Sequence, residues 1–183
     1  IEINILRNII SGQYHCFIIR VRMALLIDYE GFNFNKQWHI KEIAFALILK
    51  RSDINSFCIM NHPNLMEYDE DEQDKIMWFT EKLHGLHWNE GDITKSKLEE
   101  YMKFLATIFS VFYAKGREKC SVLPKLLGGK PVMNIEETHG VPAIQSIVGL
   151  GSKCCERHLK LRIGYRNRCP MRKIEAMLNF IYK

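Results

Sequence analysis

Asp28 and Glu30 are the residues whose types and spacing most directly suggest chemistry. They end the apolar run 23–27 and precede Gly31. Because residues i and i+2 of a β-strand point to the same face, both carboxylates would project together from a strand packed into a core. Paired carboxylates are hard oxygen ligands, which suit two divalent metal ions. The alternative is a solvated strand end with no chemical role.

The next segments predict an antiparallel meander of three strands, with the carboxylates on the first. Residues 32–37 are expected to form a short loop, 40–47 a second strand, 51–55 a polar turn and 56–59 a third strand. Further on, residues 80–86 end a helix in a His-Gly-hydrophobic turn. The hairpin connections would keep the three strands adjacent.

The middle of the chain predicts another helix and a strand–helix–strand unit. Apolar residues recur at helical spacing over 98–109, and 111–114 has the composition of a buried strand. A short helix over 121–127, stopped by two glycines, precedes a strand over 131–135. This order favours a mixed sheet. We therefore expect one α/β domain over 23–183, with a mixed sheet flanked by helices.

The order of these motifs resembles the ribonuclease H-like 3′–5′ exonucleases of the DEDD type. In that family an Asp-x-Glu strand leads into a hairpin with Glu-Ile-(Gly/Ala), then a Phe-x-x-x-Ile-x-Pro strand and a His-Gly-Ile turn. The resemblance covers roughly residues 23 to 180. It implies a ribonuclease H-like fold and Mg²⁺- or Mn²⁺-dependent cleavage of nucleic acid. The matching residues are Asp28, Glu30, Glu42-Ile43-Ala44, Phe57, Pro63 and His84-Gly85-Leu86.

The chain carries cations at the positions of the family's other catalytic groups. Lys119 aligns with the second-motif Asp, Arg168 with the His general base and Lys173 with the last Asp. Two Mg²⁺ ions need several converging carboxylates, and a lysine among them would repel the metals. We therefore predict a degenerate nuclease in which Asp28 and Glu30 are vestigial or partial. Four further carboxylates match none of these motifs, and they would complete an active site if they lay beside Asp28 and Glu30. They are Asp92, Glu136, Glu137 and Glu175.

A different metal site is suggested near the C-terminus. Cys155 and His158 form a Cys-x-x-His pair, and Cys169 follows. Thiolate and imidazole bind Zn²⁺ well, and a structural site usually has four ligands. Glu42 is a candidate for the fourth ligand, because the hairpin and the last helix meet in this fold class. Cys154 is an alternative to Cys155, and a set of merely buried thiols is the alternative to a metal site.

This second pattern resembles the Maelstrom domain of piRNA-pathway proteins. That domain is similar to the exonuclease fold without its catalytic acids, and it carries a Glu-Cys-His-Cys zinc site. Glu42-Ile43-Ala44, Cys155, His158 and Cys169-Pro170-Met171 match its motifs. The chain departs from the family in the longer spacing before Cys169, in Pro170 and in retaining Asp28 and Glu30. The resemblance implies a structural zinc ion bound by Glu42, Cys155, His158 and Cys169.

Charge is distributed unevenly along the chain. The net charge of the 183 residues is +5, but residues 153–183 hold nine Lys or Arg against two Glu, a local net of +7. An acidic run over 67–74 reads as a solvated loop. Clustered cations attract phosphate, so the tail predicts contact with single-stranded RNA or DNA. The contacting residues would be Arg157, Lys160, Arg162, Arg166 and Arg168.

Aromatic and histidine residues near the acidic run give two further expectations. Trp78, Phe79 and Trp88 would either stack on bases or pack in the core. His84 and His87 are expected to be partly buried surface residues. These side chains do not by themselves distinguish a binding surface from a packed helix end.

Composition gives broader expectations. Six scattered cysteines do not form a secreted disulfide framework, and no apolar stretch approaches the ~20 residues needed to span a bilayer. We therefore expect an intracellular protein, cytoplasmic or nuclear. The apolar residues of the segment 1–22 show no clear helical or strand periodicity. They are either an extension preceding a start at Met23 or a genuine N-terminal element.

Three functions remain open at this point. The first is a nucleic-acid-binding module derived from a DEDD exonuclease and catalytically degenerate. The second is an active exonuclease that uses Mg²⁺ or Mn²⁺, and the third is a protein-interaction domain. The first two differ in where Lys119 and Lys173 lie relative to Asp28 and Glu30.

Overall fold

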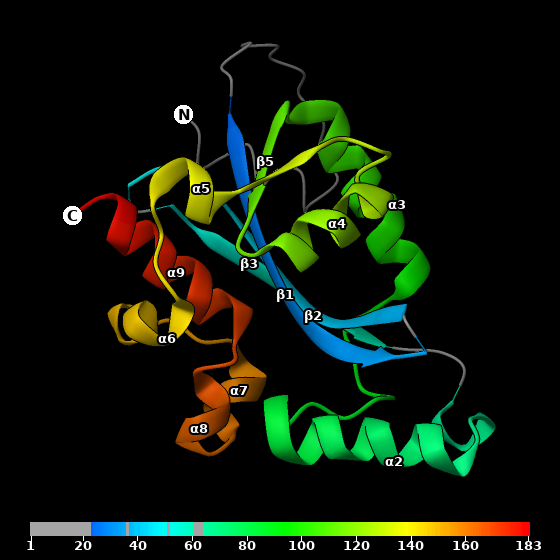
Figure 1. Cartoon of the computed structure of the whole chain (residues 1–183). Helices are drawn as coiled ribbons and strands as arrows, with labels where there is room; N and C mark the ends of the chain where they lie inside the picture. The colour runs from blue at the N-terminus through cyan, green and yellow to red at the C-terminus, as the bar shows by residue number, and fades with distance from the viewer. Residues whose placement is uncertain (1–22, 36, 51, 61–63) are drawn as a thin grey trace.

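The computed structural model describes residues 23–35, 37–50, 52–60 and 64–183. Its strands form a central sheet, and its helices surround that sheet (Figure 1). The expected extension 1–22 and Pro63 lie outside the described residues. No helix in the described ranges is both long enough and apolar enough to cross a bilayer.

Six strands of the described chain form one mixed sheet. They are β1 (Ala24–Phe34), β2 (Gln37–Leu47), β3 (Ile54–Met60), β4 (Ile93–Thr94), β5 (Val111–Ala114) and β6 (Val132–Asn134). Their order is β4-β3-β2-β1-β5-β6. The pairs β1–β2 and β2–β3 are antiparallel, whereas β1–β5, β5–β6 and β3–β4 are parallel. The predicted α/β class, the mixed sheet and the meander are therefore confirmed.

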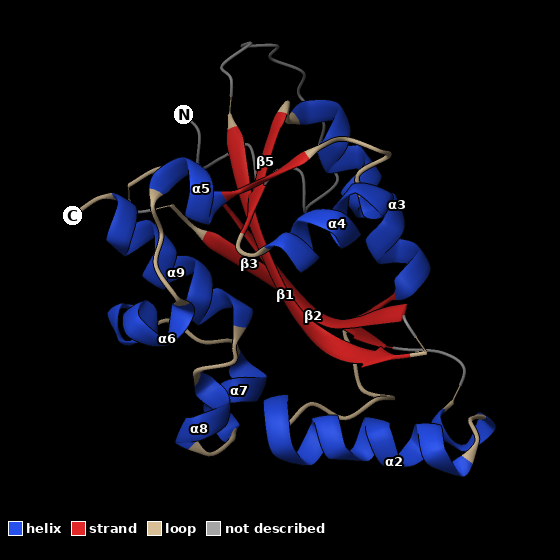
Figure 2. Cartoon of the chain, viewed as in Figure 1, coloured by secondary structure: helices blue, strands red, loops and turns tan. Residues whose placement is uncertain are grey.

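Helices pack against both faces and one end of the sheet (Figure 2). The longer ones are α2 (Glu70–Phe79), α3 (Lys95–Ile108), α4 (Arg117–Leu126) and α9 (Pro170–Ile181). Proline at the first position of α9 fits there because its fixed φ suits the helix and its missing N–H is not needed. The short ones are η1 (Leu65–Glu67), the π-helical η2 (Thr80–His84), α5 (Ile135–His139), α6 (Ile144–Ile147), η3 (Val148–Leu150), α7 (Glu156–Lys160) and α8 (Ile163–Arg166).

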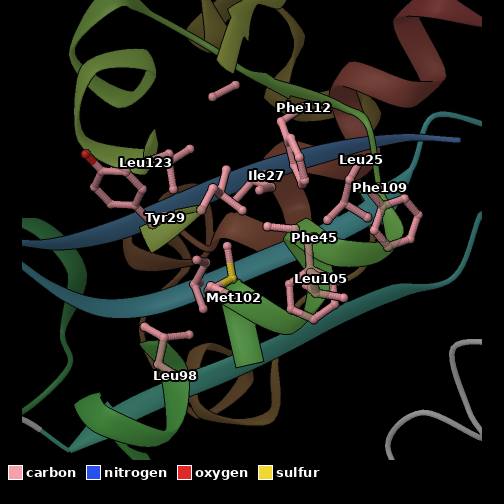
Figure 3. Packing of buried hydrophobic residues seen from close by; sticks show 14 of the residues in the cluster. Leu25, Ile27, Tyr29, Phe45, Leu98, Met102, Leu105, Phe109, Phe112 and Leu123 are labelled. Atoms are coloured by element: carbon pink, nitrogen blue, oxygen red, sulfur yellow. The ribbon is translucent and has the colours of Figure 1, made fainter. Parts of the chain in front are cut away.

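Side chains of β1 alternate between the two faces of the sheet, and each face is covered by different helices. Leu25, Ile27 and Tyr29 pack with residues of α3 and α4 (Figure 3), whereas Leu26 packs with α9 on the opposite face. Side chains alternate between faces along a strand. Asp28 and Glu30 share the parity of Leu26 and therefore face the α9 layer.

A smaller apolar cluster holds α2 against the end of β1. Its buried members are Phe32, Phe34, Ile76 and Trp88. Trp88 is 2 % exposed, so its indole belongs to the core and is closed to bases. The predicted loop over 32–37 is wrong for the same reason: burial of Phe32 and Phe34 extends β1 to Phe34.

The acidic run is also structured differently from the prediction. Asp69 caps α2 by accepting a hydrogen bond from the Glu72 backbone N–H, and Glu70, Asp71 and Glu72 form the first turn of the helix. Carboxylates are favoured there because the helix N-terminus carries unpaired N–H groups and a partial positive charge. Much of the acidic run is therefore a helix start and not a loop.

Candidate functional site

Two clusters of charged or metal-ligating residues lie on the α9 face of the sheet. The first contains Asp28 and Glu30, placed by β1 as predicted. Asp28 is 2 % exposed. The β1–β2 register shifts between Glu30 and Gly31, where an added Cβ would lie 2.2 Å from the His39 carbonyl oxygen. Glycine is therefore required immediately after the carboxylate pair.

Lys119 reaches this pair from the first turn of α4. Its Nζ lies 2.5 Å from Asp28 Oδ1 and donates to the Tyr29 carbonyl oxygen at 2.6 Å. The same ammonium lies 4.9 Å from the centre of the Tyr29 ring, a cation–π distance. Lys119 thus occupies the space beside Asp28, as its alignment with a catalytic acid predicted.

Lys173 reaches the pair from α9. Its Nζ contacts Glu30 Oε1 and lies 4.0 Å from Asp28 Oδ2. Burial alone would lower the pKa of Lys173, but attraction to Glu30 and Asp28 holds it above its ordinary value. Burial alone would raise the pKa of Glu30, but Lys173 and Lys119 outweigh it and lower that pKa. Both partners are therefore charged at neutral pH.

The carboxylate–lysine cluster, Asp28, Glu30, Lys119 and Lys173, balances two negative charges with two positive ones. The buried ammonium of Lys173 and the half-buried ammonium of Lys119 occupy the carboxylate oxygens and repel further cations. The arrangement therefore opposes binding of two divalent metal ions between Asp28 and Glu30.

The carboxylates that could have completed an acidic site lie elsewhere. Asp92 is bound by Arg157 and by the Cys58 backbone N–H, and Glu136 is bound by Lys115. Glu137 lies 3.8 Å from Arg117, and Glu175 accepts hydrogen bonds from the backbone at Ser152 and Lys153. Each has a separate local partner, so none joins the pair on β1.

The second cluster contains Glu42, Cys155, His158 and Cys169. Their ligand atoms all lie within 4.8 Å of one another. His158 Nδ1 is 3.2 Å from both Glu42 Oε2 and Cys155 Sγ, and Cys169 Sγ is 3.9 Å from Glu42 Oε1. A tetrahedral zinc ion spaces its ligand atoms about 3.3–3.8 Å apart, given its usual bond lengths. The printed separations lie close to this range, so the four side chains could hold one metal ion.

Three segments bring these ligands together. Glu42 comes from β2 and is 2 % exposed. Cys155 is the N-cap of α7, and His158 lies one turn into that helix. Cys169 immediately precedes α9, and its sulfur accepts a hydrogen bond from the Cys155 backbone N–H at 3.4 Å. The Cys-x-x-His spacing works because α7 begins at Cys155.

The donor types suit a divalent metal of the zinc type, which binds them in their deprotonated forms. The hydrogen bond from Cys155 lowers the pKa of Cys169 to about 3, which favours its thiolate. Burial lowers the pKa of His158, but the adjacent Cys169 sulfur and Glu42 carboxylate outweigh this and raise it to about 9. Burial raises the pKa of Glu42, and the Cys169 sulfur raises the pKa of Cys155. A bound metal ion would therefore displace protons from His158, Glu42 and Cys155. Glu42 Oε2 is buried without a hydrogen-bond partner among the described residues, as a metal-binding oxygen would be.

Cys154 lies outside this group although it adjoins Cys155. It is half-buried, and burial raises the pKa of its thiol to about 12. Its side chain is not among the converging ligand atoms. Of the two adjacent cysteines, the structure therefore brings Cys155 to the cluster.

The basic residues of the C-terminal segment divide into two groups. Arg157 pairs with Asp92, and Arg166 donates to the Leu159 and Leu161 carbonyl oxygens. Lys160, Arg162 and Arg168 are exposed, and none of the three forms an ion pair within the described ranges. Arg168 also lies close enough to Lys173 to oppose its protonation. Exposed positive charge therefore borders the carboxylate–lysine cluster.

Two buried polar residues differ from expectation or were missed. His84 is fully buried rather than partly exposed: its Nδ1 accepts from the Leu86 backbone N–H, and its ring packs on Phe32. Lys41 is fully buried and donates to the carbonyl oxygens of Ile59, Trp88 and Glu90. The burial of Lys41 could have been predicted from the sequence, because this lysine interrupts the apolar strand over 40–47.

Comparison of the sequence with protein-family models and with curated proteins gives no match. Function is therefore inferred from the geometry of the two clusters and from the surface beside them.

Proposed function

We propose that this chain is a nucleic-acid-binding module with a fold derived from DEDD 3′–5′ exonucleases, and that it binds without cleaving. The observation that carries the proposal is the contact of Lys119 with Asp28 at 2.5 Å, with Lys173 on Glu30. Cations stand where a metal-dependent nuclease needs more carboxylates. The antiparallel meander continued by parallel strands is compatible with a ribonuclease H-like fold.

The second cluster supports a structural zinc ion of the Maelstrom type. Glu42, Cys155, His158 and Cys169 would hold it, joining β2, α7 and the start of α9. When bound, the ion would supply a cross-link between these elements. Four protein ligands leave no position for water or substrate, which favours a structural role over a catalytic one.

Binding would depend on the exposed cations of the C-terminal segment. Lys160, Arg162 and Arg168 are available to phosphate because no described carboxylate pairs with them. Phosphate contacts release condensed counterions, so affinity falls as salt rises. This contribution is independent of base sequence.

A salt titration tests the binding function. The full chain is titrated into a labelled single-stranded RNA and the matching DNA at several salt concentrations. Replacing Lys160, Arg162 and Arg168 with Gln should reduce the slope of log K against log salt by about 2, at ~0.7 per lost contact on a single strand. Replacing the exposed Lys97, Lys103 and Lys125 is the matched control and should change it little. Absence of binding at low salt would refute the proposal.

A cleavage assay separates this function from an active exonuclease. The chain is incubated with end-labelled single strands and Mg²⁺ or Mn²⁺. We expect no shortening of the strands. Degradation that Asp28→Ala abolishes would instead establish the nuclease, and binding resistant to all charge substitutions would favour a protein-interaction domain.

A further inference from the structure

Trp78 lies at the end of α2 and is 51 % exposed. It is the only aromatic residue among the exposed large hydrophobic side chains of the described ranges. Its ring meets Phe79 edge-to-face at 5.4 Å, and Phe79 packs against the cluster around Phe32 and Trp88. The indole is thus exposed but attached to a rigid part of the fold.

The segment after Trp78 packs against α8. The Tyr165 hydroxyl donates to the Glu81 carbonyl oxygen. Gly85 lies so close to Leu161 and Tyr165 that an added Cβ would be 2.6 Å from Leu161 Cδ1, and its φ of +72° also favours glycine. The π-helical turn η2, which continues α2, accordingly lies beside α8 (Figure 1). Trp78 thus lies two residues before the helical turn that contacts α8.

We name the α2–α8 face as the exposed ring of Trp78 together with the exposed residues of α7 and α8 and the loop between them. Lys160 and Arg162 are exposed, as are the apolar side chains of Leu159 and Ile163, at 51 % and 75 %. On α2, Asp74 and Lys75 lie one turn before Trp78 and offset each other in charge, and Glu81 and Lys82, which follow Trp78, pair at 3.8 Å and do the same. The net positive charge of the face therefore comes from α7 and α8.

We propose that the α2–α8 face binds single-stranded nucleic acid, with a base stacked on Trp78 and phosphates at Lys160 and Arg162. This inference rests on the proposed function and assigns its binding surface. An aromatic platform beside cations is the arrangement that binds unpaired bases without sequence preference, because every base has a π-face. A duplex hides those faces. The acidic first turn of α2 repels phosphate and limits the face at its other end.

The experiment compares Trp78 variants of the full chain by binding to a labelled single-stranded oligonucleotide and to its duplex. Trp78→Ala should weaken single-strand binding about tenfold or more while leaving the salt slope unchanged, because stacking is lost and no phosphate contact is. Trp78→Phe should restore most of the affinity. Met77→Ala, which changes the exposed neighbour, is the matched control and should bind as the native chain does.

The charge variant gives an independent readout. Arg162→Gln should reduce the salt slope by about 0.7, the value for one phosphate on a single strand. Asp74→Asn should strengthen binding at low salt, because it removes the negative charge next to Trp78. Duplex affinity should be insensitive to Trp78→Ala.

The outcomes separate this inference from the proposed function. If the native chain binds single strands and Trp78→Ala binds equally well, the α2–α8 face is wrong and the binding function stands. If the native chain binds no nucleic acid, both fail. Unchanged affinity combined with loss of self-association in Trp78→Ala, measured by sedimentation, would overturn the inference and assign the face to contact between two copies.

Discussion

Glu30 and Glu42 lie directly opposite each other across the β1–β2 ladder, and each serves a different cluster. Glu30 is bound by Lys173, whereas Glu42 faces Cys155, His158 and Cys169. Cys169 and Lys173 are in turn one helical turn apart at the start of α9. The same two strands and one helix therefore position the metal-ligand cluster and the carboxylate–lysine cluster. A substitution in one cluster should therefore alter the positions of the side chains in the other.

Removing Lys173 should be strongly destabilising. Lys173→Met leaves Glu30 with Lys119 alone, 4.0 Å away, and breaking a buried pair costs at most about 3–5 kcal/mol. The free energy of unfolding can be measured by urea denaturation. Adding Glu30→Gln to the same chain should recover part of the loss, because no uncompensated charge is then buried. Equal stability of Lys173→Met and the native chain would contradict the buried pair.

Removing the metal should loosen the start of α9. We expect elemental analysis to find one zinc ion per chain and a strong chelator to lower the thermal unfolding midpoint, because the ion would join β2, α7 and α9. Cys169→Ser should lose the ion and become insensitive to the chelator. Cys154→Ser is the matched control, since its thiol lies outside the cluster, and should keep both properties. Zinc retained by Cys169→Ser would refute the assigned ligands.

Stability should fall with acid because of His84. Burial lowers its pKa to about 4, compared with about 6.5 in an unfolded chain. Between these values the unfolded chain binds more protons, so this contribution is complete above about pH 6.5 and is lost as the pH falls towards 4. The difference corresponds to at most about 3 kcal/mol.

The variant His84→Asn isolates this effect. Its side-chain oxygen takes the position of Nδ1, so it can accept the Leu86 N–H, and it does not titrate. Urea denaturation at pH 7 and pH 4.5 should show a smaller acid loss in His84→Asn than in the native chain, while other titrating groups contribute equally to both. Parallel pH profiles would show that His84 does not protonate on unfolding.

Local patterns predicted the meander, the carboxylate pair and the Cys-x-x-His pair, whereas the family resemblance placed Lys119, Lys173 and Glu42 at the two clusters. Strand parity places Asp28 with Glu30, and a helix beginning at Cys155 brings His158 beside it. Burial set by distant segments was not predictable. The depth of His84 depends on Phe32 and Leu86, and that of Lys41 on carbonyl oxygens of Trp88 and Glu90. No spacing within the chain encodes those contacts.

The cations beside Asp28 and Glu30 should be what prevents metal binding at this pair. Replacing both Lys119 and Lys173 with Asp converts two positive and two negative charges into four carboxylates, the ligand type that Mg²⁺ and Mn²⁺ require. We expect the double variant to bind Mn²⁺ in isothermal titration calorimetry and the native chain to show no binding at these carboxylates. Lys125→Asp with Lys183→Asp makes the same charge change at exposed positions and should gain no such site. If the native chain binds Mn²⁺ as tightly as the double variant, and Asp28→Asn abolishes that binding, then Lys119 and Lys173 yield to metal. The charge argument against metal-dependent cleavage at this pair would in that case be wrong.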